Sequence, residues 1–223
     1  MIVVVTGLAF EARIAAGPGV RVICQQNTTL ADVLVPAIAD DCEGVVSFGT
    51  AGGLVRDARP GAWVIARSVI AGQRRYSADP TWSAALENTL RGAVSDVRIG
   101  DIAGVPHPVV SASDKEALYR RTHAIAADME SQVVARLATA RDIPFVCCRV
   151  VIDPAERSLP DAALAGMKPD GSTDVGAVIR SLLKRPAQLP ALLSVARDAA
   201  HAQRSLKRGR AAIGNAFEYV STR

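Results

Sequence analysis

Two acidic residues stand where an α/β protein can use them for chemistry. Glu130 lies in the segment 128–131 (DMES), between a short apolar run and a helical pattern, and Asp153 ends the apolar run that begins at Phe145. A carboxylate such as that of Glu130 can accept hydrogen bonds from two neighbouring sugar hydroxyls, although a helix dipole would also favour an acid there. A carboxyl group in apolar surroundings, as expected for Asp153, has a raised pKa and can protonate a leaving group, although a turn cap is the alternative.

Residues near two other predicted strand ends could complete such a site. The segment 49–53 (GTAGG) follows a buried strand and predicts a tight turn. The alternative is a binding loop whose backbone amides face an anion or a sugar oxygen. It lacks the lysine of a P-loop and the spacing of a dinucleotide fingerprint. After the first strand, Glu11 could orient a water molecule and Arg13 could hold a phosphate, or the two could form an exposed helical pair.

Arg149 lies inside the same apolar run that Asp153 ends. A buried guanidinium without a partner is costly. We therefore expect Arg149 to pair with a carboxylate, and both Asp153 and Glu130 are candidates.

The spacing of apolar residues predicts the elements that would hold these residues. Strand-like runs occupy residues 2–6, 20–24, 44–48, 62–70, 96–103, 107–110, 124–128 and 145–152. Helical patterns occupy residues 10–16, 29–40, 81–91, 114–121 and 131–141, the fourth with Asp114 as its cap. The alternation predicts an α/β fold in a single domain, residues 1–223, with a mixed, mostly parallel central sheet flanked by helices. Ligands of such sheets bind beyond the carboxyl ends of the strands.

The composition is typical of a cytoplasmic globular protein. The chain has 223 residues, of which 49% are apolar and 4% aromatic. Its longest apolar runs are strand-sized, well short of the ~18 residues of a membrane span, and its N-terminus does not resemble a signal peptide. Four cysteines without a CxxC motif and three histidines predict neither a metal site nor a disulfide.

The C-terminal segment 174–210 is predicted to be helical and is strongly basic. Residues 180–210 contain eight Lys or Arg and one acid, a net charge of +7, so the rest of the chain carries −3 of the total +4. Such a segment could contact nucleic acid or an anionic membrane, whereas the simplest interpretation is a solvated helix face.

Taken in order, these motifs resemble the purine nucleoside phosphorylase/nucleosidase superfamily. The matching pieces span residues 1 to about 165: Gly7 with Glu11, segments 48–53 (FGTAGG), 110–114 (VSASD), 128–131 (DMES) and 144–146 (PFV), then Arg149 and Asp153. Within the superfamily, segments 7–13 and 152–160 are most similar to the hopanoid-associated branch, whose members are linked to removal of adenine from adenosylhopane to give ribosylhopane. The resemblance implies cleavage of a purine N-glycosidic bond by water or phosphate, and a homo-oligomer in which a neighbour can complete the site.

The resemblance also implies roles for individual residues. Glu130, aided by Met129, would bind the ribose hydroxyls, Asp153 would protonate nitrogen seven of the purine, and Glu11 would prepare the water. The further substrate-binding residues would be Thr50, Gly52 and Ser113. The candidate phosphate-binding residues are Gly7 and Arg13. No cofactor or metal is implied, and inorganic phosphate is the one candidate co-substrate.

Three hypotheses follow for the function. The first is release of adenine from adenosylhopane in hopanoid biosynthesis, in which the basic amphipathic tail would give a peripheral contact with the inner membrane. The second is cleavage of a small soluble nucleoside such as methylthioadenosine or adenosine. The third is a non-catalytic nucleoside- or nucleic-acid-binding protein. Nucleic acid is not expected as a partner, because electrostatic binding to it gives no reason to place Glu130 and Asp153 in one pocket.

Overall fold

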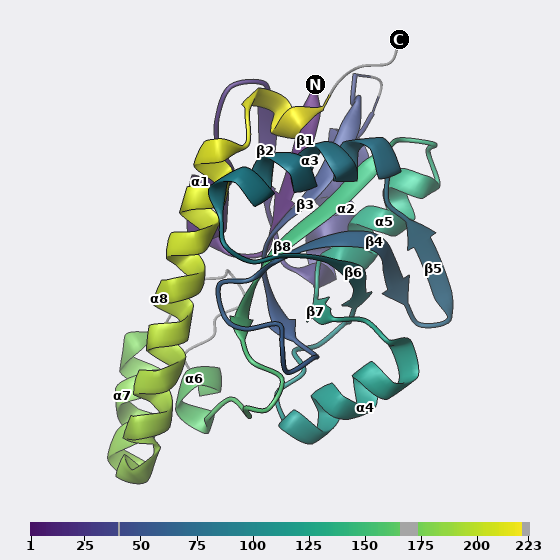
Figure 1. Ribbon diagram of the computed structural model, residues 1–223. Helices are drawn as coiled ribbons and strands as arrows, with labels where there is room; N and C mark the ends of the chain where they lie inside the picture. The colour runs from purple at the N-terminus through teal and green to yellow at the C-terminus, as the bar shows by residue number, and fades with distance from the viewer. Residues whose placement is uncertain (40, 166–173, 220–223) are drawn as a thin grey trace.

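An eight-stranded mixed sheet forms the centre of the chain (Figure 1). The computed structural model describes residues 1–39, 41–165 and 174–219. The strands are β1 (Ile2–Thr6), β2 (Val20–Cys24), β3 (Gly44–Gly53), β4 (Trp63–Ala71), β5 (Arg74–Ser77), β6 (Val97–Gly104), β7 (Ala126–Asp128) and β8 (Phe145–Asp153). The helices are α1 (Ala9–Ala15), α2 (Asn27–Ala37), α3 (Pro80–Ala93), α4 (Ala112–Thr122), α5 (Ser131–Thr139), α6 (Asp161–Ala165), α7 (Val175–Lys184) and α8 (Leu189–Ala212). These elements confirm the predicted α/β fold.

Part of the sheet closes on itself. β1 lies between β2 and β3, parallel to both. β3 runs parallel to β8 and antiparallel to β7, while β8 also pairs antiparallel with β4. β6 is parallel to both β4 and β7. Because β8 reaches both β3 and β4, the strands β3, β7, β6, β4 and β8 form a closed ring.

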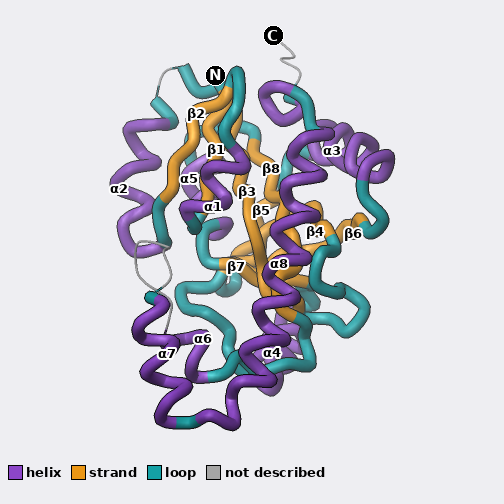
Figure 2. Tube along the Cα trace, turned by 90° about the vertical axis from the view of Figure 1, so that its left-hand side faces the viewer, coloured by secondary structure: helices purple, strands orange, loops and turns teal. Residues whose placement is uncertain are grey.

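Helices cover the sheet from two sides (Figure 2). α2 and α5 contribute Leu34 and Val134 to one buried apolar cluster, together with the sheet residue Val45. α3 and α8 contribute Leu86 and Leu206 to a second cluster on the other side of the sheet. Apolar residues three or four apart on each helix form these inward faces, as the helical spacing predicts.

The glycine-rich segment 49–53 is not the predicted tight turn, because β3 continues through it to Gly53. The strand pairs with β1 over its first half and with β7 over its last residues. Its register against β8 shifts between Ala51 and Gly52, and Gly49 has a φ of +145°, which L side chains rarely adopt. Small residues therefore allow the strand to bend and change neighbours instead of ending it.

Two other predictions of local structure are corrected, and one strand was missed. Residues 107–110 do not form a strand, because Pro106 and Pro108 lack the amide hydrogens that a sheet requires. α4 is capped by Ser111, whose hydroxyl accepts a hydrogen bond from the Asp114 amide at 3.0 Å, so Asp114 is not the cap. The hairpin strand β5 was not predicted, because its arginine-rich sequence has no apolar alternation.

The basic C-terminal segment forms α7 and α8, separated by a short 3₁₀ turn that begins at Pro186. The second half of α8 packs on the sheet, where Ala202, Leu206 and Gly209 are buried. α7 and the start of α8 extend away from the sheet (Figures 1 and 2). In the described part of the chain, no helix combines the length and apolar character needed to cross a membrane.

Candidate active site

A cavity of about 410 Å³ lies among residues that follow β1, belong to the second half of β3, or end β7 and β8. Its polar and charged lining residues are Glu11, Gln26, Thr50, Lys115, Asp128, Glu130 and Asp153. Most of its other lining side chains are apolar. Glu130 and Asp153, which come from different elements, therefore face the same cavity.

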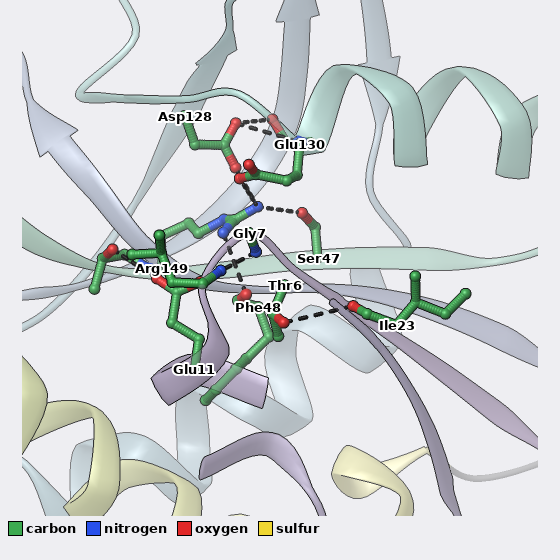
Figure 3. Close-up of polar contacts among 12 residues, drawn as sticks. Thr6, Gly7, Glu11, Ile23, Ser47, Phe48, Asp128, Glu130 and Arg149 are labelled. Carbon is green, nitrogen blue, oxygen red and sulfur yellow. Dashed lines mark hydrogen bonds and ion pairs between the residues drawn. The ribbon is translucent and has the colours of Figure 1, made fainter. Parts of the chain in front are cut away.

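Arg149 is the central cation beside this cavity (Figure 3). Its side chain is fully buried, and its Nη2 lies 2.5 Å from Asp128 Oδ2 and 3.4 Å from Glu130 Oε2. Its Nη2 also donates to Ser47 Oγ at 2.6 Å, and its Nη1 donates to the carbonyl of Phe48 at 3.2 Å. Of the two candidate partners, the structure selects Glu130, and it adds Asp128, which the sequence did not suggest.

Asp153 does not pair with Arg149, although both belong to β8. Four residues of an extended strand separate two side chains on the same face by about 13 Å. Asp153 lines the cavity directly, whereas Arg149 lies outside the lining and contacts the lining residues Asp128 and Glu130.

Asp128, and not Glu130, makes the hydrogen bonds that cap α5, so the Glu130 side chain is free to face the cavity. The Oδ1 of Asp128 accepts hydrogen bonds from both the amide and the hydroxyl of Ser131, the first residue of α5. Glu130 occupies the N-cap position, but its side chain makes no capping hydrogen bond. Its carboxylate instead lies against Gly7, where a Cβ atom would come within 2.7 Å of the carboxylate carbon. The capping role that could have explained Glu130 therefore belongs to Asp128.

Burial dominates the electrostatics of Glu130. The side chain is 6% exposed, and burial raises its pKa to about 8. The positive charge of Arg149 opposes this rise, while the nearby Asp128 and Glu11 add to it. Glu130 can therefore be protonated near neutral pH, and positive charge or hydroxyl donors in a ligand would favour its ionised form.

Glu11 is held rigidly at the start of α1. Its Oε1 accepts hydrogen bonds from the amide and hydroxyl of Thr50 at 2.8 and 2.7 Å, and its Oε2 accepts from the amides of Gly7 and Leu8 at 3.2 and 3.1 Å. Burial raises the pKa of Glu11, and the charge of Arg149 and the Thr50 hydroxyl oppose the rise. A Cβ atom at Gly49 would lie 2.5 Å from Glu11 Oε2, so the glycine makes room for this carboxylate.

Asp153 ends β8 with its carboxylate in contact with a lysine. Asp153 is 8% exposed, and Lys115 of α4, which is 1% exposed, donates a hydrogen bond to its Oδ2. Burial raises the pKa of Asp153, and the charge of Lys115 is the largest effect that lowers it. Lys115 was missed by the sequence analysis. Its spacing of three residues from Leu118, which puts both on the inner face of α4, was the available signal.

The remaining predicted site residues fall into two groups. The lining of the cavity includes Gly7, Thr50, Gly52 and Met129. It does not include Ser113 or Arg13. Ser113 is exposed in the first turn of α4, where its hydroxyl lies 2.9 Å from that of Ser111. Arg13 is exposed and bonds back to the carbonyl of Ala9, because two residues along a helix turn it away from Glu11.

The described residues contain no group of three or more His, Cys, Asp or Glu side chains arranged to hold a metal ion. The polar lining can instead hold a neutral ligand with hydroxyl groups through its carboxylates. It places one carboxyl group against a lysine and two near a buried arginine.

Solved structures share this fold at low sequence identity. The 5′-methylthioadenosine/S-adenosylhomocysteine nucleosidase of Helicobacter pylori is 15% identical, with a TM-score of 0.64 over 93% of this chain and 96% of that one. The futalosine hydrolase of the same organism is 16% identical, with a TM-score of 0.62 over 82% and 97%. The 5′-methylthioadenosine/S-adenosylhomocysteine nucleosidase of S. pneumoniae is 15% identical, with a TM-score of 0.63 over 93% and 98%.

A comparison with curated protein sequences finds no match. A family model described as the phosphorylase superfamily matches residues 3–197, which is most of the chain. That stretch includes all of β1 except Ile2, the strands β2 through β8 and the whole polar lining of the cavity. The chain therefore belongs to the phosphorylase superfamily.

Proposed function

We propose that the protein cleaves the N-glycosidic bond of a purine nucleoside and releases the base. The observation that supports this most directly is the convergence of buried acids on one cavity, among them Glu11, Glu130 and Asp153. Such bonds break through a ribose that becomes positively charged while the base becomes negatively charged. Cleavage needs a carboxylate that stabilises the cationic sugar, a carboxylic acid that protonates the base and a carboxylate that orients the water. These three side chains match those needs.

Each proposed role follows from a contact. Glu130 accepts hydrogen bonds from the ribose hydroxyls and stabilises the cationic sugar, with its carboxylate placed by Arg149 and Gly7. Asp153 gives a proton to the departing purine. Glu11, fixed by Thr50, orients the attacking water. Phosphate remains a candidate nucleophile, bound beside Gly7 at the cavity edge. Arg13 is exposed and lies outside the cavity lining, so it would have to move to contact a phosphate there.

The apolar part of the cavity lining indicates which kind of nucleoside would fit. Side chains from α1, β8, the segment after it, α6 and α8 contribute here: Phe10, Ile152, Leu159, Ala163, Val195 and Ala199. This lining suits a nucleoside with an apolar substituent. Adenosylhopane is the substrate named by the resemblance to the hopanoid-associated branch. A cavity of about 410 Å³ lies near the lower end of small-molecule sites, so the nucleoside would fill it and the polycyclic tail would extend outside.

The C-terminal helices offer a surface for such a tail. Large apolar side chains on α7 and the start of α8 are exposed: Ile179, Leu183, Leu189 and Leu193. The cations Arg180, Lys184 and Arg197 lie on the same two helices. Exposed leucines beside cations favour contact with an anionic membrane surface. Because α8 also contributes Val195 and Ala199 to the cavity, this surface adjoins the site.

Membrane contact is tested by flotation with anionic vesicles at low salt. The wild type should float with the vesicles, and the double variant L183E/L193E should not. V35E on α2, which also replaces an exposed apolar residue, is the control and should float. Equal behaviour of all three proteins would contradict this contact.

A second substrate candidate is a small soluble nucleoside. The modest volume of the cavity favours it, and the names of the structural neighbours include nucleosidases of methylthioadenosine. The catalytic roles of Glu11, Glu130 and Asp153 would be unchanged. A homo-oligomer, which the family resemblance implies, is proposed as well and is measured by light scattering of the purified protein.

Product analysis tests the proposal. The protein is incubated with adenosylhopane, methylthioadenosine or adenosine, with and without phosphate, and the products are identified by mass spectrometry. Free adenine with ribosylhopane indicates hydrolysis of the lipid-linked substrate, and its phosphate ester indicates phosphorolysis. Adenine released from the soluble nucleosides alone supports the second candidate. Absence of base release from all three would contradict the proposed function.

A further inference from the structure

Lys115 is a buried cation that joins α4 to the end of β8. The residue is 1% exposed, and its Nζ donates to the carboxylate of Asp153, to the carbonyl of Pro154 at 2.8 Å and to the carbonyl of Arg157 at 3.0 Å. All three hydrogens of the ammonium group are thus used. Lysine is rarely buried so completely unless it is paired, and this one lies in the lining of the cavity.

Two opposing effects act on the pKa of Asp153, the proposed proton donor. Burial raises the pKa of Asp153, whereas Lys115 lowers it. Two further charged groups face this carboxyl group: Arg157 lowers its pKa and Asp198 of α8 raises it. Those two residues pair with each other, so their effects oppose and Lys115 is the dominant charge.

The contact also distinguishes the two oxygens of Asp153. Lys115 binds Oδ2. Gly52 lies beside both oxygens, since a Cβ atom there would be 3.4 Å from Oδ1 and 3.6 Å from Oδ2, so only the hydrogen bond from Lys115 distinguishes them. Asp153 lines the cavity, and because Lys115 binds Oδ2, Oδ1 is the oxygen to which a ligand can bind without displacing the lysine.

Building on the proposed function, we propose that Lys115 is the positioning residue of Asp153. It holds Oδ2, leaves Oδ1 to carry the transferred proton, and stabilises the carboxylate that forms when the proton leaves. Neither the sequence motifs nor the family resemblance gives Lys115 a role.

As the glycosidic bond breaks, its electron pair moves to the purine. The O–H bond at Asp153 Oδ1 breaks and an N–H bond forms on the purine, so the base departs neutral. Asp153 becomes a carboxylate facing the ammonium of Lys115, which stays protonated throughout. Asp153 regains its proton from the water that attacks the ribose or from solvent after the base leaves.

The central variant is K115M, with R121M as the control because it removes an exposed cation from the same helix. Loss of the lysine should lower kcat for purine release by about 10- to 100-fold, part of the effect of general acid catalysis. A general acid works only while protonated, so activity falls as pH rises through its pKa. Since K115M removes the largest influence that lowers the pKa of Asp153, the basic limb of the rate profile should move to higher pH. R121M should leave rate and profile unchanged.

A second substrate separates positioning from damage to the fold. A 4-nitrophenyl riboside has a leaving group that needs no protonation, so K115M should cleave it nearly as fast as the wild type. K115R, which restores the charge, should return the basic limb towards its original pH. If K115M does not fold, K115Q replaces it. Equal losses on both substrates with an unmoved basic limb would overturn the proposal and leave Lys115 a structural residue.

A titration without turnover separates this inference from the proposed function. Carbon-13 NMR of labelled aspartate follows Asp153 directly, with D153N used to assign its signal. The signal should titrate at higher pH in K115M than in the wild type, and an unchanged titration overturns the inference. If the titration moves but the wild type releases no purine, the proposed function fails while the control of Asp153 by Lys115 stands.

Discussion

The carboxylate of Asp128 pairs with the buried guanidinium of Arg149 at 2.5 Å and also caps α5 through Ser131. One side chain thereby links the start of a helix to the middle of the central strand β8. The pair holds Arg149 beside Glu130, whose carboxylate lies 3.4 Å from the same nitrogen. The position of the proposed ribose-binding acid therefore depends on a pair that does not itself need to contact a ligand.

Substitution D128N tests this dependence. Loss of one member of a buried ion pair typically costs about 3–5 kcal/mol, because the other charge stays buried without its partner. We expect the free energy of unfolding, measured by urea denaturation, to fall by about this amount. D142N is the control: this exposed residue has a positive φ of 52°, which Asn also tolerates. A loss no greater than that of D142N would contradict the structural role of the pair.

Substitution D153N tests the proposed proton donor. The amide keeps the size of the side chain but cannot give a proton, so adenine release should slow by about 100- to 10,000-fold. Circular dichroism should show an unchanged fold. Near-normal turnover would exclude Asp153 as the general acid, whatever the substrate.

Gly49 provides a steric test of the Glu11 site. A methyl group at this position would meet the Glu11 carboxylate at 2.5 Å, and the φ of +145° disfavours any side chain. G49A should therefore lower the free energy of unfolding by about 1–3 kcal/mol and displace Glu11, with loss of activity. G92A in α3 is the matched control, because nothing lies within 4 Å of its new methyl group. That change should be neutral or stabilising by up to about 1 kcal/mol, as expected for a glycine in a helix.

Glu130 predicts a dependence of stability on pH. Burial raises its pKa in the folded protein to about 8 from an ordinary value of 4.5, so the folded state binds a proton that the unfolded state releases. The contribution of this group to the free energy of unfolding is present below pH 4.5 and is lost as pH rises to about 8. E130Q cannot titrate and should avoid this loss.

Differential scanning calorimetry measures the effect. The Tm of E130Q relative to that of the wild type should increase between about pH 5 and pH 8. The same variant should bind nucleosides more weakly, because it lacks the carboxylate that accepts the ribose hydroxyls. A Tm difference that stays constant over this range would show that Glu130 is not the buried, proton-binding acid described above.

Local sequence patterns predicted much of the fold. Almost all residues of β1 and β8 are buried because both faces of these strands are covered, and their mostly apolar runs identify strands without tertiary information. The patterns failed where local preference and environment disagree. The segment 49–53 has the composition of a turn, yet β7 and β8 supply hydrogen-bond partners that keep it extended.

The sequence predicted part of the candidate site, because several of its residues lie near strand ends. Glu11, Glu130 and Asp153 follow or end strands, and the closed topology brings strand ends together, while Thr50 lines the same cavity from within β3. Ser113 was placed near the base from a motif, but the first turn of α4 directs it outward. Lys115, two residues further on, reaches the cavity instead, because 100° per residue separates the faces of a helix.

Composition and periodicity thus determined the α/β class, the order of most elements and the types of groups available for catalysis, since these depend on residues close together in the chain. Tertiary structure alone decided which charges meet. Asp128 rather than Asp153 pairs with Arg149, and Lys115 pairs with Asp153 across 38 residues. Partners so distant in sequence are chosen by the register of the strands and the packing of α4, which no local pattern encodes.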